Sequence, residues 1–393
     1  AYQELQTLIE AVTDAVDGLA LPAYSSLGSE NSFDARSASL STSSGGTVTG
    51  LAVDVTSDAI NGDYEIEVLQ LAQAMKISAS TGSSTEAIGA AGVMSLGVEG
   101  GETVDITVTA TTTLSDLAKA INAQSDKTGV QASLISLDSS TVQLVLSATD
   151  TNQTIVISSV SGDDVAQTIG LTDDTGAFAN VLREALPSIV TVDGATVTRD
   201  TNELTDVIEG VSLSLSGVTD GASTLTITTD SSAVKTAITD FVDAYNALKQ
   251  YMLDQSAVSS DGGKDEDAVL FADSVMRMLD STLQTLINAG SDAASDDITM
   301  FSDMGITWTS NGLLEISDET ALNNAILSNL DALEGFFETD FSTSDSNLKL
   351  LANNTTSSLA FTLTVTTDAS GAITGVAADG DSAAFTISGS RLV

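Results

Sequence analysis

The segment Asn61-Gly62-Asp63-Tyr64-Glu65-Ile66-Glu67-Val68 alternates polar and apolar side chains, which is typical of a β-strand with one buried face. Leu51, Val53 and Val55 show the same alternation shortly before it. An Asn-Gly pair between two alternating runs is the strongest short-range signal for a β-hairpin. We therefore expect a hairpin that turns at Asn61-Gly62, inside a strand-rich region that spans residues 33–78.

Strand patterns continue beyond this hairpin and are interrupted by one short helix, expected at Leu114–Asn122. The strands expected around that helix cover residues 104–108, 130–137, 142–146 and 154–158. Residues 159–187 are weakly patterned, and we place a boundary near Pro187. Strands return at residues 188–229 and include a second hairpin, in which Asp193-Gly194 supplies the turn.

Helical periodicity marks both flanks of the strand-rich region. Near the start, six apolar residues recur every three or four positions on one expected helix: Leu5, Leu8, Ile9, Val12, Val16 and Leu19. Gly18 and Pro22 mark the end of that helix. After Ser231 the pattern predicts three further helices, within residues 231–252, 270–286 and 317–337, with a hairpin at residues 306–316. Alternation then returns at residues 345–393.

The order of these patterns predicts an elongated α+β multi-domain protein with a nested plan. One amphipathic helix cannot bury its apolar face alone, so the first helix is expected to pack with those after residue 231. We therefore expect a discontinuous helical-bundle domain (residues 1–32 and 231–344) that carries a discontinuous β-rich domain (33–78 and 188–230). An outer β-rich domain (79–187) is inserted into the latter, and residues 345–393 form an extra, truncated β-rich segment.

The residue inventory excludes several classes of enzyme. The 393 residues include no His and no Cys, so a Ser-His-Asp triad, a thiolate nucleophile and a Cys-ligated zinc cannot be built. Carboxylate-pair chemistry remains open in principle, but 55 Asp and Glu make chance pairs abundant. A net charge of −43 argues against nucleic acid and against anionic membranes as partners.

The sequence contains no apolar stretch long enough to span a membrane, so we expect no membrane insertion. It begins without Met, inside a helical pattern, and no basic segment followed by an apolar one is present. We therefore expect an internal fragment of a longer protein, without a signal peptide.

Few segments suggest a ligand site, and each has a plainer interpretation. The acidic run 261–267 lacks the spacing of a calcium loop, and Asp173-Asp174-Thr175-Gly176 is also best interpreted as a solvated loop. Gly89-Ala90-Ala91-Gly92 is not followed by the Lys of a phosphate-binding loop. The methionines of the helical region are expected in its core, namely Met252, Met276, Met278, Met300 and Met304. Trp308, the single Trp, is expected to pack against the helices.

Several runs of residues resemble the flagellar capping protein family, also called hook-associated protein 2. The resemblance lies in residues 32–38, 62–76 (which contain Leu71-Ala72-Gln73), 241–248 (which contain Tyr245-Asn246), 304–307 and 311–316. Ala120-Ile121-Asn122 with residues 129–133 is similar to an Ile-Asn motif shared with some flagellins. Residues 345–393 differ from the simplest family members, in which helix continues there.

This resemblance implies a non-catalytic protein at the tip of the extracellular bacterial flagellum, exported by the flagellar secretion apparatus without a cleaved signal. It implies a homo-oligomeric ring, such as a pentamer, that promotes the folding and polymerisation of flagellin. The implied partners are further copies of the chain, flagellin, the hook-filament junction protein and an export chaperone that binds a C-terminal segment missing here. No catalytic, cofactor-binding or metal-binding residue is implied.

Two other functional classes remain open from the sequence. A secreted adhesin or surface-layer module would also be acidic, β-rich and rich in Ser and Thr, although helices with a Tyr-Asn motif argue against it. A carboxylate-pair glycosidase is the second alternative, but only 4% of the residues are aromatic, which leaves little for a sugar-binding platform.

Overall fold

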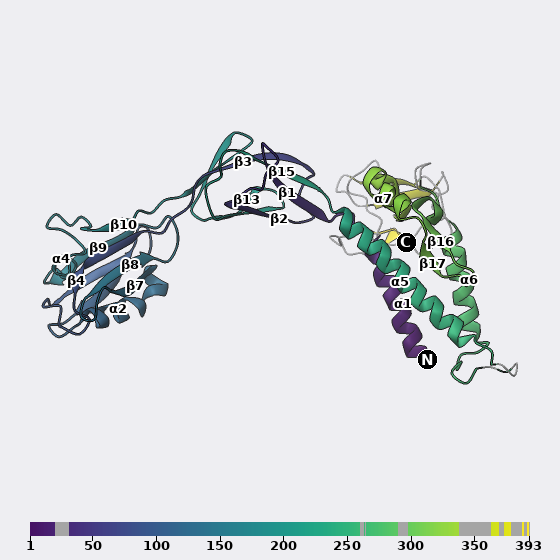
Figure 1. The fold of residues 1–393 in the computed structure, drawn as a ribbon, viewed down its shortest axis with the longest axis horizontal. Helices are drawn as coiled ribbons and strands as arrows, with labels where there is room; N and C mark the ends of the chain where they lie inside the picture. Colours follow the sequence, from purple (N-terminus) through teal and green to yellow (C-terminus); the bar gives the residue numbers. More distant parts are fainter. Residues whose placement is uncertain are drawn as a thin grey trace. The chain divides into compact units, whose positions relative to one another are not determined.

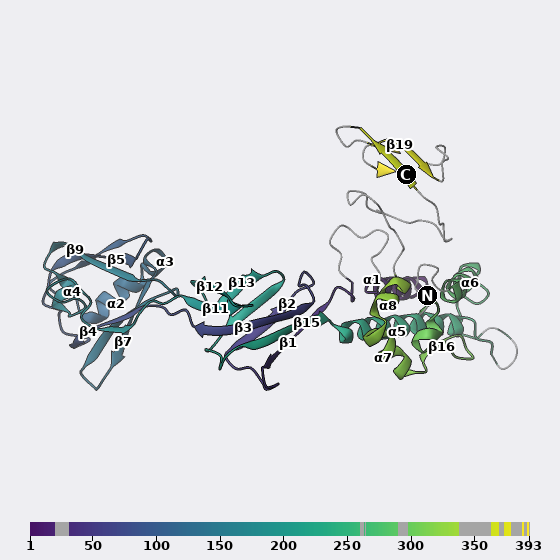
Figure 2. The ribbon, with the colours of Figure 1, turned by 90° about the horizontal axis from the view of Figure 1, so that it is seen from above.

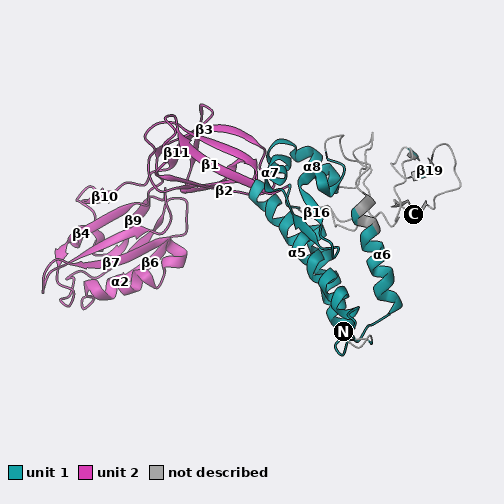
Figure 3. Ribbon diagram, turned by 45° about the vertical axis from the view of Figure 1, so that its right-hand side comes forward, with its two compact units in different colours: residues 1–33, 231–393 teal, residues 34–230 magenta. Residues whose placement is uncertain are grey.

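The computed structural model describes residues 1–19, 31–259, 263, 265–289, 298–337, 363–368, 373–378, 387–388 and 391–392. The protein is a mixed helix-and-sheet, multi-domain chain (Figure 1). It divides into two compact units (Figure 3). Unit 1 consists of residues 1–33 and 231–393, and unit 2 consists of residues 34–230.

Unit 1 is built on three long helices, α1 (Tyr2–Asp17), α5 (Ser231–Gln255) and α6 (Ser274–Ala289). Helix α1 lies alongside α5 in both views (Figures 1 and 2). The helix expected near the start is therefore present, but its apolar face is only partly covered. Leu5 is buried against α5, whereas the side chains of Ile9 and Val16 are exposed. The side chain of Leu286, which was expected on the apolar face of the helix within residues 270–286, lies outside the described residues.

Among its described residues, unit 1 also contains a small hairpin and two short helices. The 3-10 turn η1 (Phe301–Met304) leads into the expected hairpin, formed by β16 (Ile306–Trp308) and β17 (Leu314–Ile316). The helix expected at residues 317–337 is in fact two helices, α7 (Glu319–Ser328) and α8 (Leu330–Phe337). They break at Asn329, whose φ of −133° is not helical.

This break has a packing reason. Phe336 and Phe337 of α8 both make edge-to-face contacts with Phe301, with ring centroids 5.0 and 6.2 Å apart. Leu322 of α7 and Leu333 of α8 are buried in the same cluster. A change of direction at Asn329 lets both apolar faces reach one core, which periodicity alone did not indicate.

Most of the alternating segment 345–393 and Pro22 lie outside the described residues. The described part contains two short strand pairs, β18 (Leu363–Thr367) with β19 (Ile373–Ala378) and β20 (Ile387–Ser388) with β21 (Arg391–Leu392).

Unit 2 contains two separate hydrophobic clusters. The first lies between a five-stranded sheet, in the order β1-β15-β3-β11-β12, and a three-stranded sheet, in the order β13-β14-β2. The strands are β1 (Arg36–Thr42), β2 (Leu51–Val55), β3 (Gly62–Gln70), β11 (Ser188–Val192), β12 (Ala195–Arg199), β13 (Glu203–Ile208), β14 (Val211–Leu215) and β15 (Ser223–Thr229).

The hairpin expected at Asn61-Gly62 is wrong. Strand β2 pairs with β14, and β3 pairs with β15 and β11, so the Asn-Gly segment connects two different sheets. The apolar side chains of β2 and β3, such as Leu51 and Ile66, belong to one core, and they meet there from opposite sheets. Burial across the sandwich therefore overrides the local turn signal. The hairpin expected at Asp193-Gly194 is confirmed, and both of its turn residues have positive φ.

The second cluster of unit 2 lies between a four-stranded sheet, β10-β4-β8-β7, and a three-stranded sheet, β6-β5-β9. The strands are β4 (Lys76–Gly82), β5 (Gly92–Val98), β6 (Val104–Val108), β7 (Val130–Ser136), β8 (Val142–Ala148), β9 (Ile155–Gly162) and β10 (Val181–Arg183). The expected helix is α2 (Leu114–Asn122), and a capping box between Thr113 and Asp116 starts it. Two single turns, α3 (Ser125–Thr128) and α4 (Val165–Thr168), complete this part.

Candidate functional site

Within the described residues, an asparagine side chain forms two hydrogen bonds with the backbone of one distant residue at three places, and we call each of these pairs an asparagine clamp. At the end of α2, Asn122 Nδ2 donates to the carbonyl oxygen of Ala132 (2.9 Å), and the Ala132 N–H donates to Asn122 Oδ1 (2.7 Å). Ala132 lies in the edge strand β7. The amide therefore satisfies one backbone donor and one acceptor that the sheet leaves unpaired.

The same geometry recurs between Asn202 and Ala72. Asn202 Nδ2 donates to the Ala72 carbonyl oxygen (2.9 Å), and the Ala72 N–H donates to Asn202 Oδ1 (2.8 Å). Ala72 belongs to Leu71-Ala72-Gln73, one of the runs that carried the family resemblance. Asn202 carries no periodic or turn signal in the sequence that separates it from other loop asparagines, and sequence reasoning missed it.

The third clamp joins α5 to the β16–β17 hairpin of unit 1. Asn246 Nδ2 donates to the Leu314 carbonyl oxygen and the Leu314 N–H donates to Asn246 Oδ1, both at 2.8 Å. Beside it, the Tyr245 hydroxyl donates to the Gly312 carbonyl oxygen (3.2 Å). The Tyr245-Asn246 pair therefore positions the hairpin on the helix, which is a structural role.

A partly buried ion pair lies next to this clamp. Lys249 Nζ binds Asp280 Oδ1, and the side chain of Lys249 is only 7% exposed, against 37% for Asp280. Gln284 Nε2 also donates to Asp280, at 3.0 Å. Burial, followed by the negative charge of Asp280, raises the pKa of Tyr245 to about 12. The Tyr245 phenol therefore stays protonated under ordinary conditions and can donate its hydrogen bond.

The loop at Asp173, which could have suggested a metal site, is built as a turn. Asp173 Oδ1 accepts from the Thr175 N–H (2.8 Å), the Thr175 hydroxyl (2.6 Å) and the Ala177 N–H (3.0 Å). These bonds, led by the Thr175 hydroxyl, lower the pKa of Asp173. In the acidic run 261–267, the Asp265 carboxylate accepts from the Asp267 N–H, while residues 261, 262 and 264 lie outside the described residues.

The methionines fall into two groups. Met252, Met276 and Met304 are buried, as expected, whereas Met278 is 66% exposed and Met300 is 48% exposed. The expectation of core positions is therefore wrong for the last two. Met278 lies on the outer face of α6, and Met300 precedes η1 as its N-cap residue. Trp308 packs edge-to-face on Tyr245 of α5, with centroids 5.9 Å apart, so its expected packing against the helices is confirmed.

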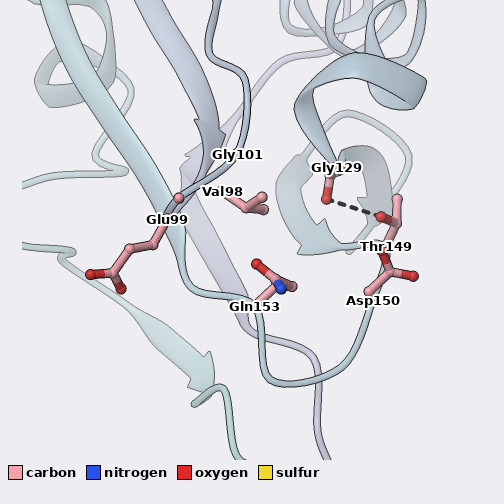
Figure 4. Close-up of a pocket in the computed structure, with 8 residues that line it drawn as sticks. Val98, Glu99, Gly101, Gly129, Thr149, Asp150 and Gln153 are labelled. Atoms are coloured by element: carbon pink, nitrogen blue, oxygen red, sulfur yellow. Dashed lines mark hydrogen bonds between the residues drawn. The ribbon is translucent and has the colours of Figure 1, made fainter. Parts of the chain in front are cut away.

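A shallow recess of about 250 Å3 lies at one end of the second cluster of unit 2. Its walls are the β5–β6 turn, Gly129 and the β8–β9 loop (Figure 4). Thr149 Oγ1 donates to the Gly129 carbonyl oxygen at 3.2 Å. The carboxylates of Glu99 and Asp150 point away from each other, to opposite sides of the recess (Figure 4). They do not converge on a point that a cation could occupy.

Within the described ranges, no group of three or more His, Cys, Asp or Glu side chains is arranged to hold a metal ion. None of the helices in those ranges is long and apolar enough to cross a membrane.

Three family models match successive parts of the chain. The flagellar hook-associated protein 2 N-terminus matches residues 1–75, and the flagellin hook IN motif matches residues 96–150. The flagellar hook-associated protein 2 C-terminus matches residues 185–382, which is half of the chain. Asn122 lies within the segment matched by the IN motif, in agreement with the Ile-Asn resemblance.

Two relatives have similar sequences. The B-type flagellar hook-associated protein 2 of Pseudomonas aeruginosa is 32% identical over 311 residues, which cover 74% of this chain and 64% of that protein. The flagellar hook-associated protein 2 of Aeromonas caviae is 27% identical over 351 residues, covering 85% of this chain and 71% of that protein. The chain therefore spans roughly two thirds of the length of these relatives.

A solved structure has the same fold over most of the chain. It is the flagellar cap protein FliD from Escherichia coli, in a crystal structure of its D1-D2-D3 domains. It is 28% identical, has a TM-score of 0.62, and covers 86% of this chain and 90% of its own. Since the C-terminal family model alone spans half of the sequence and the other two precede it in order, the chain belongs to the flagellar hook-associated protein 2 family.

Proposed function

We propose that this protein caps the bacterial flagellar filament. It forms a homo-oligomeric ring at the filament tip and promotes the folding and polymerisation of flagellin there, without catalysing a reaction. The observation that carries the proposal is the likeness over 86% of the chain to a protein described as a flagellar cap protein. The relatives compared above are named hook-associated protein 2, and none of them is named an adhesin.

The non-catalytic part of the proposal is supported by what surrounds the polar side chains. The full sequence has no His and no Cys. Polar groups that the fold draws together, such as Asn246 with Leu314 and Lys249 with Asp280, bind other parts of the same chain. They are occupied in holding elements in place rather than directed at a substrate.

The proposal includes the nested plan of domains. Two segments far apart in sequence, residues 1–33 and 231–393, form unit 1, while the chain between them forms unit 2. Unit 2 has one core built from residues near its two ends and a second core built from the residues between. An arrangement of this kind sends the chain out through each part and back.

The proposed partners are further copies of this chain, flagellin, the hook-filament junction protein and an export chaperone. The protein reaches the tip through the flagellar export apparatus. In this proposal neither nucleic acid nor the membrane is a partner, which agrees with the net charge of −43.

Complementation tests the proposal. The full-length gene is expressed in a strain that lacks its own cap protein, and filament length and flagellin in the medium are measured. We expect filaments to form and free flagellin to fall, because a capped tip retains the subunits. Export of the protein is measured in parallel, so that a failure of secretion is not mistaken for a failure of capping.

An exported protein that leaves filaments absent and flagellin monomeric would contradict the proposal. If the same protein bound mucin or a host surface without restoring filaments, it would act as an adhesin instead.

A further inference from the structure

The two hydrophobic clusters of unit 2 are connected by only two segments of chain. The chain leaves the first cluster at residues 71–74 and returns at residues 185–187. Parts of a chain joined in this way are expected to move relative to each other unless the contact between them is extensive. The contacts at the crossing therefore decide whether unit 2 bends.

The two connecting segments are bonded to each other. The Gln73 N–H donates to the Leu186 carbonyl oxygen (2.8 Å), and the Leu186 N–H donates to the Gln73 carbonyl oxygen (3.1 Å). Gln70 Nε2 donates to the Pro187 carbonyl oxygen at 2.7 Å. This pairing makes a two-stranded ribbon. A ribbon resists sliding of one segment along the other, but it can still bend and twist.

A third contact lies beside the ribbon and connects the two parts through other loops. Asn152, in the β8–β9 loop of the second part, donates from Nδ2 to Asp200 Oδ1 at 2.7 Å. The Thr151 hydroxyl donates to the backbone carbonyl oxygen of Asp200. Asp200 lies between β12 and β13, in the first part, while the Asn152 N–H also donates to the Gln73 carbonyl oxygen (2.9 Å). The β8–β9 loop thus binds both the ribbon and the part beyond it.

The backbone of Asn152 lies in the left-handed region, with a φ of +54°. Asparagine adopts this region more readily than most non-glycine residues, so the conformation suits the turn between β8 and β9. Two residues beyond Asp200, the Asn202 clamp on Ala72 fixes the same end of the ribbon.

We propose that the Asn152–Asp200 contact is a lock that makes the two β-rich parts of unit 2 one rigid body, and that opening it frees a hinge at residues 71–74 and 185–187. Two bonded segments leave bending and twisting free. A third attachment away from them opposes both motions. This inference concerns the isolated chain and does not depend on the proposed function.

The absence of cysteine from the sequence allows a direct test. Ser39→Cys in β1 and Gln131→Cys in β7 place one exposed label in each part, and pulsed electron spin resonance measures the distance distribution between them. We expect a narrow distribution with the lock intact. Asn152→Asp places a second carboxylate against Asp200, so we expect the distribution to widen to at least twice its original width. The widening should be greater at ~10 mM than at ~150 mM NaCl, because salt screens the repulsion.

Two further variants separate the lock from other effects. Asn152→Gly keeps the left-handed backbone accessible but removes the amide, so it should widen the distribution without the salt dependence. Asn61→Asp makes the same chemical change at an exposed site in the first part and should leave the distribution narrow. A wide distribution in the parent protein would overturn the proposal, and so would a narrow one in both Asn152 variants with the fold intact by circular dichroism.

Discussion

Gly305 lies directly against the carbonyl oxygen of Asp318: a Cβ atom added to Gly305 would stand 2.3 Å from that oxygen. Gly305 ends η1 with a φ of +78°, and its own carbonyl oxygen accepts the N–H groups of Ser317 (2.9 Å) and Asp318 (3.2 Å). Asp318 in turn caps the N-terminus of α7 through the N–H groups of Thr320 and Ala321. A single glycine thus fixes the β16–β17 hairpin against the start of the next helix.

Gly305→Ala should therefore destabilise unit 1. The left-handed backbone alone costs a non-glycine residue roughly 1–2 kcal/mol, and the contact with Asp318 adds to this because backbone cannot move aside easily. Urea unfolding followed by the fluorescence of Trp308, the single Trp, measures the loss. Gly335→Ala is the matched control: it lies in α8 with nothing near its added Cβ, so it should gain about 0.5–1 kcal/mol. Equal effects of the two variants would refute the close-contact explanation.

The Lys249–Asp280 pair should respond unequally to removal of its two partners. Asp280→Ala leaves a buried ammonium group without its counter-charge, whereas Lys249→Met removes the buried charge and keeps the apolar stem. Breaking a fully buried pair costs about 3–5 kcal/mol; the partial exposure of Asp280 reduces this, so we expect a loss of about 1–3 kcal/mol for Asp280→Ala. Lys249→Met should be closer to neutral. A double-mutant cycle measured by urea unfolding tests this expectation. A greater loss of unfolding free energy for Lys249→Met would mean that the other contacts of Lys249 matter more than its charge.

The raised pKa of Tyr245 predicts a contribution to alkaline unfolding. The phenol has a pKa of about 12 in the folded protein and near its ordinary value of 10.0 once unfolded. Its contribution to stability is therefore complete below pH 10 and is lost as the pH rises toward 12, because the unfolded chain releases the proton first. Tyr245→Phe should flatten the fall in unfolding free energy over that interval. Tyr64→Phe, in unit 2, serves as the control, and an unchanged slope in Tyr245→Phe would contradict the assignment.

Asp138 should stabilise the fold at neutral pH and lose this contribution in acid, which is the opposite pH dependence to that of Tyr245. The N–H groups of Ser140 and Thr141, both 2.8 Å from Asp138 Oδ1, lower its pKa from 3.8 to about 2. The stabilisation is present above pH 4 and is lost as the pH falls through about 2. Asp138→Ala should therefore unfold at lower urea than the parent at pH 7, with a gap that narrows toward pH 2. Ser139→Ala, at the same turn, should show no such gap. A gap that stays constant with pH would exclude the carboxylate as its cause.

Self-association should strengthen with salt. Each chain carries a net charge of −43, and the proposed ring would bring several such chains together. The screening length is ~30 Å at 0.01 M salt and ~10 Å at 0.1 M, so repulsion between whole subunits acts mainly at low salt. Sedimentation across a NaCl series should show larger assemblies as salt rises, with divalent cations effective at lower concentration. Association that weakens as salt is added would show that specific ion pairs drive it.

The sequence predicted elements whose partners are near in the chain. The turn at Asp193-Gly194 fixes β11 and β12 because both strands touch that turn. The Asn61-Gly62 signal failed because the partner of β2 is β14, more than 150 residues later, and no local pattern encodes that choice. Likewise, the helical periodicity of the sequence continues through Asn329 and gives no sign of the break there. The change of direction at Asn329 allows contacts with Phe301, and these contacts are made only in the folded unit.

The polar contacts also divide into those that the sequence could indicate and those that it could not. Asn122 and Asn246 stood in segments that the family resemblance had already marked, although their geometry could not be known. Asn202 was not found at all, because its clamp on Ala72 joins loops 130 residues apart. A side chain that binds the backbone of a residue far away in the sequence produces no periodic pattern in the residues next to it.

The asparagine clamps also limit how acidic this chain can become. Acid is tolerated at 55 positions, and an aspartate differs from an asparagine by a single group. A carboxylate has no N–H to give, so an aspartate at 122, 202 or 246 would set an anion against the carbonyl oxygen of Ala132, Ala72 or Leu314. Replacement of Asn by Asp is therefore disfavoured at these three positions, where the backbone N–H and carbonyl groups distinguish an amide nitrogen from a carboxylate oxygen.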